Sequence, residues 1–473
     1  MNGRFPFRFR IIHHAILGIL LCVSTTCCFE AAGGQETGRP EENRFDLPTL
    51  VKRAVAESPE IGEAQSALAA SMSALAAIRA AFFPRIDGTA LVGPTERADE
   101  PLIVDNRITD PSRGMRLSNI GAFGRLDFTL TQPLYTFGRL SNLKNAARLG
   151  ADAKKEEIAK TADNLALQVS RLYYALLVAQ KGMDATLDAD RFFDNAEQRI
   201  NSLLKVQSPN VSQSDLYMIE AFRSGIQRSR VVAQKGIDTA TFALRSIVNL
   251  PAGVPFEIAP APLEIEDSPS EPLDAAIQQA YARRPEFRQL RDAVEASRYQ
   301  REAAYSDLYP SFFLAIVGSL AGAPGRDRFD NPYIIDQFNH EYVGVVAGAR
   351  WEFDFGIKKA RISEADAQYR KMRHTQKKAE MNIPIQVAKA RDELIEWEKS
   401  ARIYQRAATA SRKWVVSAFT DFDMGVGTAE NLLKAIEKYG ENQADYIDAL
   451  FHYHLAMLDL RYATGSIRET IGH

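Results

Sequence analysis

The sequence predicts a mainly α-helical protein with a membrane β-barrel part, built on a β-β-α-α plan that occurs twice. Two 26-residue segments, Pro59 to Pro84 and Pro285 to Pro310, align without a gap. Each is followed by runs in which apolar and polar residues alternate, as in strands with one buried face. Each half then continues with a long stretch of helical periodicity and a shorter one, which together predict a helical hairpin.

The first 28 residues have the features of a secretory leader. Three arginines and no acid precede a short apolar run from Ala15 to Val23. This run is shorter than the roughly 20 residues that span a bilayer, so residues 1–28 are predicted to be a cleaved signal peptide. All three cysteines lie within them, and the mature chain is expected to hold no disulfide. Alternatively, Cys28 could carry a lipid after cleavage of the leader, although the preceding "TTC" matches a lipoprotein box poorly.

Composition and charge narrow the class of protein. With 46% hydrophobic residues, the 473-residue chain can bury a sizeable core. Its formal charge of −2 gives no reason to expect a nucleic-acid partner. After the leader, no stretch is long and apolar enough to span a bilayer as a helix, so any membrane contact is expected through strands.

The two aligned segments indicate an internal duplication, because seven of their positions are identical. Each is predicted to be a helix with proline in its first turn and a closing proline that cannot continue it. The predicted organisation is therefore a first repeat at 29–250, a linker at 251–270 and a second repeat at 271–473.

The clearest strand pattern runs from Tyr342 to Phe355, with an apolar face that includes Trp351 and Phe353. A soluble sandwich is one interpretation, but four strands are too few for a second domain of that kind. In a membrane barrel the apolar face meets lipid, and four strands must share the barrel with copies of the chain. Three copies are favoured over two, because eight strands enclose a space that side chains fill. Three polar-face residues are predicted to face the lumen: Arg350, Glu352 and Asp354.

Helical periodicity predicts two long rods, each with a shorter return helix. The first rod runs from Gly138 to about Val206, and its roughly 68 residues would reach about 100 Å. The second runs from Gly356 to about Phe422, with a local bend expected at Pro384. The return helices are predicted from Ser212 to Leu250 and from Thr428 to Ala463.

The tips of the two predicted hairpins have corresponding capping residues. In the first tip, Ser212 precedes Asp215 by three positions, as in a capping box. In the second, Gly425 is a plausible left-handed helix stop, and Thr428 precedes Asn431 in the same way. Capping alone explains these residues, so a functional role needs separate evidence.

These features resemble the outer-membrane factor family, the TolC-like outer-membrane efflux proteins. The resembling segments are "LTQPLYTFGR", "RRPEFRQL…DLYP", "IVNLP" and "DMGVGTAENLLKA…YATG". The resemblance covers the whole mature chain, in order and twice. It implies a homotrimer in the outer membrane, whose protomers each give four strands to a twelve-stranded barrel continued by a periplasmic α-helical tunnel.

The resemblance also suggests roles for individual residues. Pro133, Gly138 and Gly356 are expected where barrel strands become tunnel helices, since proline ends ladder pairing and glycine tolerates a sharp turn. The family's second tip reads approximately G-x-x-T-x-x-D-x-L-x-A, and this chain departs from its acidic pattern at Asn431 and Lys434. Three nearby acids could supply a substitute negative field at a constriction, with a solvated helix end as the alternative: Asp421, Asp423 and Glu430. In the first tip, Asp215 matches the acidic position, although capping explains it as well.

No nucleophile, general base or phosphate loop is recognisable, so neither an enzyme nor a cofactor is predicted. His452 and His454 stand two positions apart, on different faces of a helix, which argues against a shared metal. Asp327 and Asp330 lack the spacing of a calcium loop and are expected in a solvated loop.

The sequence therefore predicts a passive exit duct of a tripartite efflux or type I secretion system. Its expected partners are a periplasmic adaptor (membrane fusion protein), an inner-membrane pump and outer-membrane lipid. The alternative is a non-conducting periplasmic coiled-coil scaffold or adaptor. An adaptor is expected to have one hairpin inside a single β-rich module, whereas this chain has two hairpins, each preceded by a strand pair.

Overall fold

The computed structural model describes residues 44–97, 103–104, 107–108, 120–251, 253–265, 272–328, 333 and 336–468. The predicted signal peptide, all three cysteines, Asp330 and part of the predicted 251–270 linker lie outside the described residues.

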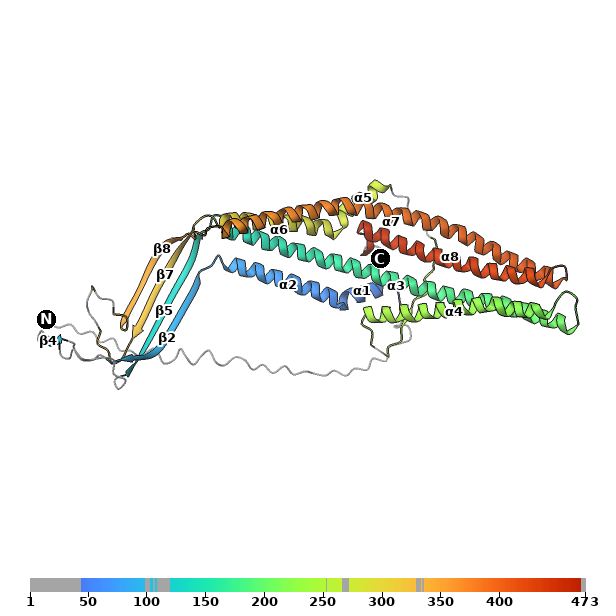
Figure 1. The fold of residues 1–473 in the computed structure, drawn as a ribbon, viewed down its shortest axis with the longest axis horizontal. Helices are drawn as coiled ribbons and strands as arrows, with labels where there is room; N and C mark the ends of the chain where they lie inside the picture. The colour runs from blue at the N-terminus through green and yellow to red at the C-terminus, as the bar shows by residue number, and fades with distance from the viewer. Residues whose placement is uncertain are drawn as a thin grey trace. The chain divides into compact units, whose positions relative to one another are not determined.

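The main elements repeat in order and in length (Figure 1). The first half contains α1 (Leu47–Glu57), α2 (Pro59–Ala80), β2 (Arg85–Glu96), β5 (Ile120–Tyr135), α3 (Arg139–Lys205) and α4 (Gln213–Ile247). The second half contains α5 (Leu273–Arg283), α6 (Pro285–Ser306), β7 (Ser311–Gly322), β8 (His340–Arg350), α7 (Ile357–Asp423) and α8 (Ala429–Thr464). Four two-residue strands complete the order: β1 (Arg44–Phe45), β3 (Ile103–Val104), β4 (Arg107–Ile108) and β6 (Glu257–Ile258). Helices α2 and α6 have 22 residues each and α3 and α7 have 67 each, so the structure bears out the repeated plan.

The predicted helices begin and end within a few residues of their expected bounds. The structure adds α1 and α5, two 11-residue helices that were not predicted separately. Helix α7 continues through Pro384, whose missing N–H leaves the carbonyl of Glu380 without its usual helical partner. The Tyr281 hydroxyl of α5 donates to that carbonyl oxygen at 3.2 Å, so a neighbouring helix supplies the lost hydrogen bond.

The four long strands form one antiparallel sheet in the order β2-β5-β7-β8 (Figure 1). Pairing of β5 with β7 joins the two halves of the chain, for example at Leu126 and Leu320. One face exposes apolar side chains, among them Val343 and Val345 of β8, at 70% and 67%. On the other face, the Ser319 hydroxyl lies 2.6 Å from an Asp127 carboxylate oxygen. The sheet therefore has one apolar and one polar face, as the alternating pattern predicted.

Strand β8 is shorter than the alternating pattern from Tyr342 to Phe355 predicted. It ends at Arg350, so Glu352 and Asp354 lie in the connection to α7 rather than in a strand. The Asp354 carboxylate accepts hydrogen bonds from the backbone N–H groups of Gly356 at 3.3 Å and Lys358 at 2.8 Å. The first turn of α7 needs such an acceptor, and this need outweighs continuation of the alternating pattern.

Pro133 does not end the strand in the way expected. Pairing of β5 with β2 stops at Thr131, but pairing with β7 continues through Pro133 to Tyr135, with a bulge between them. A bulge is a position at which a strand tolerates proline. Gly138 and Gly356, with φ of 84° and 143°, directly precede α3 and α7 in backbone conformations that favour glycine.

Two large apolar clusters stabilise the helical part. The first joins α1 to the middle of α3 and the end of α4, and includes Leu50, Val169 and Leu244. The second joins the ends of α3, α4, α7 and α8 behind the two hairpin tips. Helix α3 also packs against α8, so the two hairpins of one chain are in contact along their length.

Candidate functional site

The tip of the first hairpin contains a complete capping box. The Asp215 carboxylate accepts hydrogen bonds from the Ser212 backbone N–H at 2.8 Å and from the Ser212 hydroxyl at 3.2 Å. A carboxylate in the first turn also interacts favourably with the positive end of the helix dipole. Asp215 therefore stabilises the start of α4, as its position in the sequence suggested.

The tip of the second hairpin is a tight turn closed by backbone hydrogen bonds. Gly425 has φ of 78°, and the N–H groups of Val426 and Gly427 donate to the Asp421 carbonyl at 3.0 and 2.9 Å. The Thr428 hydroxyl accepts from the Asn431 backbone N–H at 3.2 Å and caps α8. The two tips meet where the Asn210 side-chain amide donates to the Gly425 carbonyl at 3.4 Å.

The acids predicted at the second tip differ in how far their charges are compensated. An Asp423 carboxylate oxygen lies 2.7 Å from Arg199 Nε, which belongs to α3 of the first hairpin. Lys434 lies 2.6 Å from the Glu430 carboxylate and lowers its pKa by hydrogen bonding and charge. Within the described residues, the Asp421 side chain has no hydrogen bond or ion pair. Asp421 is therefore the acid of this group whose charge the chain leaves uncompensated.

Arg199 is a residue that the sequence did not identify. It lies 224 positions from Asp423 and also donates to the Asp423 backbone carbonyl at 3.3 Å. A contact across such a separation leaves no local sequence pattern. Together with the Asn210 contact, it holds the end of α7 against the first hairpin.

The two hairpins differ in how their helices are joined near the tips. In the first, Arg223 of α4 pairs with Asp194 at 2.8 Å and Glu197 at 3.0 Å, both on α3, and Arg230 pairs with Asp190. At the corresponding level of the second hairpin, the ion pairs of Lys434 and Lys438 are formed within α8 itself. Ionic contacts therefore link the helices of the first hairpin to each other.

The two histidines of α8 stack on aromatic rings of two different helices. His454 lies 4.5 Å from Tyr174 of α3 between ring centroids, and His452 lies 4.4 Å from Trp397 of α7. His454 is only 3% exposed, and burial lowers its pKa to about 4. The described residues contain no cluster of three or more His, Cys, Asp or Glu that could hold a metal ion.

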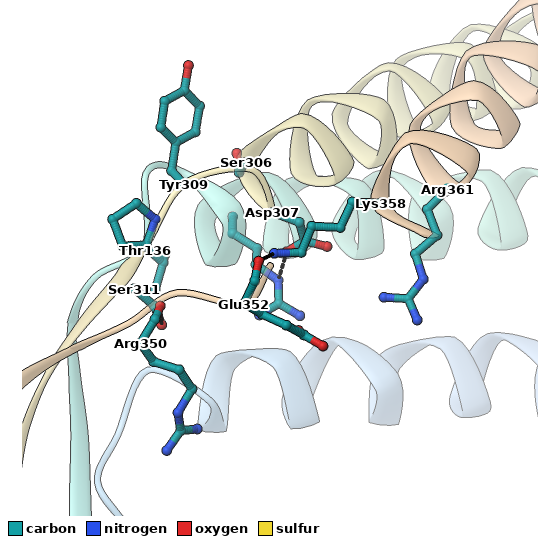
Figure 2. A pocket seen from close by; sticks show the side chains of 11 residues that line it. Thr136, Ser306, Asp307, Tyr309, Ser311, Arg350, Glu352, Lys358 and Arg361 are labelled. Carbon is teal, nitrogen blue, oxygen red and sulfur yellow. Dashed lines mark hydrogen bonds and ion pairs between the residues drawn. The ribbon is translucent and has the colours of Figure 1, made fainter. Parts of the chain in front are cut away.

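A pocket of about 140 Å³ lies at the strand-to-helix junction (Figure 2). Its lining comes from three connections, β5 to α3, α6 to β7 and β8 to α7, and includes Arg139, Asp307 and Lys358. Arg139 Nε lies 2.7 Å from an Asp307 carboxylate oxygen, an ion pair that joins the two repeats. Arg350 and Glu352, both predicted to face a lumen, are lining residues of this pocket.

Comparison with known proteins agrees with this architecture. The model of the family described as outer membrane efflux protein matches residues 50–201 and 276–466, which cover both repeats. The chain belongs to the outer membrane efflux protein family. This efflux protein is accordingly assigned to the outer membrane, with a periplasmic extension. No helix in its described part has the length and apolar character needed to cross a membrane.

Several solved channel structures share its fold. The efflux protein is similar to CusC (TM-score 0.72, 15% identity, 89% of this chain and 92% of that chain) and to the outer-membrane channel OprN (0.72, 16%, 89% and 90%). It is also similar to the open state of the MtrE outer membrane channel of Neisseria gonorrhoeae (0.70, 17%, 89% and 88%). No curated protein sequence matches the chain significantly.

Proposed function

We propose that this efflux protein is the exit duct of a tripartite efflux or type I secretion system, through which substrate passes passively from the periplasm or an inner-membrane pump to the exterior. The observation that carries the proposal is a four-stranded amphipathic sheet with two outer strands, continued by long helical hairpins. Nothing in this role requires chemistry on the substrate. The two repeats, assigned to 29–250 and 271–473, each contribute two strands and one hairpin.

The working assembly is a homotrimer with a twelve-stranded barrel. In this sheet β2 and β8 each pair with one long strand, and a bilayer cannot satisfy an open strand edge. Three copies supply enough strands for a water-filled interior, with Arg350 and the Asp127–Ser319 pair on the lumen side. Exposed apolar residues on α4 and α7, including Val231, Phe242 and Ile403, support further contacts between copies.

The hairpin tips form the periplasmic entrance and dock on an adaptor. Apolar side chains are exposed there, including Val206, Met424 and Val426, and suit a partner that covers them. Asp421 supplies an uncompensated negative charge near the constriction. Opening moves the second hairpin away from the first and breaks the Arg199–Asp423 ion pair.

Disulfide cross-linking tests the shared barrel. The only native cysteines lie in residues 1–28, so introduced cysteines can be read without background in a chain lacking the leader. Within one chain, β5 and β7 separate β2 from β8 by about 14 Å, beyond the roughly 7 Å limit for a disulfide. A disulfide between a cysteine introduced on β2 and one introduced on β8 must therefore join two copies. Ala90→Cys is combined in turn with Val343→Cys, Val345→Cys or Ala347→Cys to sample the register.

A trimeric barrel predicts that at least one pair yields a covalent product of three chains on a denaturing gel. The single variant Ala90→Cys is the control and should yield no such product. A product that stops at two chains, or no product in any register in membrane-inserted protein, would contradict the shared twelve-stranded barrel.

A further inference from the structure

We infer that the pocket at the strand-to-helix junction binds an oxyanion of the phosphate or carboxylate class, carried by a solute that moves through the duct. The inference rests on the proposed duct function, because the solute must reach the pocket from the lumen. It adds a substrate-contacting site that is distinct from the hairpin tips.

Cations outnumber carboxylates in the lining of the pocket. The four cations are Arg139, Arg350, Lys358 and Arg361, and the two carboxylates are Asp307 and Glu352. Arg139 is paired with Asp307, and Lys358 Nζ donates to the Glu352 backbone carbonyl. This leaves the guanidinium groups of Arg350 and Arg361 without an ion pair within the described residues, opposite the single unpaired carboxylate of Glu352.

The two guanidinium groups have the chemistry that an oxyanion requires. A guanidinium presents parallel N–H donors that match two oxygens of a phosphate or carboxylate. Arg350 is held over the Phe313 ring, 5.5 Å from its centroid, which limits the positions that its head group can take. At about 140 Å³, the pocket has room for an anion together with waters, each of which occupies about 30 Å³.

The first part of α7 adds to the positive potential around the pocket. Between Ile357 and Lys378 the chain has eight lysines and arginines but only two acids, Glu364 and Asp366. Within the described residues, none of these eight cations forms an ion pair, and Asp366 is engaged by Arg301 of α6 at 3.9 Å. Such a one-sided charge distribution raises the local concentration of anions.

Strand register assigns the pocket to the polar face of the sheet. Arg350 of β8 pairs with Ser311 of β7, so the two side chains lie on the same face of the sheet. Side chains an even number of positions along a strand share a face, so His340 of β8 and Ser319 of β7 lie on that face too. His340 and Ser319 are hydrogen-bonded to each other at 2.8 Å. Figure 2 shows Arg350, Glu352 and Arg361 pointing to one side of the ribbon and the Tyr309 ring pointing to the other. This orientation favours an anion from the lumen over a lipid headgroup at the apolar face.

Isothermal titration calorimetry tests the site directly. Inorganic phosphate and pyrophosphate are titrated at low ionic strength into the full protein in dodecyl maltoside, a detergent without phosphate. Arg350→Gln/Arg361→Gln should weaken binding at least tenfold. Lys399→Gln/Lys413→Gln removes the same charge from α7 beyond Lys378, away from the pocket and its positive segment, and should weaken binding less than twofold. Equal binding by wild type and the pocket variant, or an equal loss in both variants, would overturn the site.

A second arm separates the two sources of phosphate. The titration is repeated in nanodiscs of phosphatidylglycerol, where a lumen site should still bind free phosphate with unchanged affinity. If the lipid abolishes that binding, the occupant is a headgroup and the solute assignment is wrong.

Planar-bilayer recording distinguishes failure of the site from failure of the duct. Millimolar phosphate should reduce the potassium chloride conductance of wild type, and the reduction should be lost in Arg350→Gln/Arg361→Gln. A protein that conducts but binds no phosphate would refute the pocket alone. One that binds phosphate at the pocket but never conducts would refute the duct and, with it, the assignment of the anion to a transported solute.

Discussion

Arg199→Ala is expected to favour opening of the periplasmic tip, because it removes the cation that ties α3 to the end of α7. The Arg199 and Asp423 side chains are 36% and 54% exposed, so water and salt screen their attraction. Exposed pairs of this kind contribute about 0.5 kcal/mol each. If the three tips of a trimer open together, the total is about 1.5 kcal/mol, which raises the ratio of open to closed states about 13-fold.

The assay is single-channel open probability in a planar bilayer at fixed, moderate salt. Arg191→Ala is the matched control, since Arg191 is also on α3 but pairs with Asp188 of the same helix at 3.0 Å. It should leave the open probability unchanged, and the exchange Arg199→Asp/Asp423→Arg should restore the wild-type value. The reasoning is refuted if Arg199→Ala does not open the channel, or if Arg191→Ala opens it equally.

Three further changes test the packing. Phe193 is fully buried behind the tips, so Phe193→Ala should lower the free energy of unfolding by about 3–5 kcal/mol in denaturant titrations. Leu187 is exposed on the same helix, so Leu187→Ala should lower it by less than about 1 kcal/mol. Equal losses in the two variants would contradict this packing. Because the pKa of His454 falls from 6.5 to about 4 on folding, only the unfolded chain is protonated between these values, and stability is lost as pH falls through this window. The melting temperature of His454→Phe should therefore fall less than that of wild type between pH 7.5 and pH 4.5. An equal fall would show that His454 is not responsible for the loss of stability at low pH. A Cβ at Gly318 would overlap the Phe128 ring, so Gly318→Ala should reduce the fraction of protein inserted into liposomes. Adding Phe128→Leu should restore insertion. Full insertion of the single variant would be inconsistent with the cross-strand contact.

The long elements could be predicted from sequence because their periodicity extends over many residues. The rods α3 and α7 and the hairpin caps follow from local patterns of this kind. The end of β8 could not be predicted in this way, because the alternation of apolar and polar residues continues to Phe355. The structure ends the strand at Arg350, and Asp354 instead accepts a hydrogen bond from the first turn of α7. The continuation of β5 past Pro133 has no sequence signal for a related reason: it depends on a bulge, which only the pairing with β7 reveals.

The candidate sites were less predictable than the fold. From the sequence, Asp423 and Glu430 were expected to contribute uncompensated negative charge at the tip. In the structure Asp423 pairs with Arg199, and Glu430 pairs with Lys434 one helical turn away. The junction pocket combines three connections that are far apart in the chain. Its charge balance depends on which of these cations meets an acid, and only the tertiary arrangement determines that.

Single-channel conductance of the detergent-purified mature protein in a planar bilayer tests the central claim most directly. A duct predicts discrete, long-lived current steps in wild type and an altered conductance or cation preference in Asp421→Ala/Asp423→Ala/Glu430→Ala. The account is contradicted if the folded protein stays soluble without detergent and does not insert, or if it inserts and neither wild type nor Arg199→Ala ever conducts.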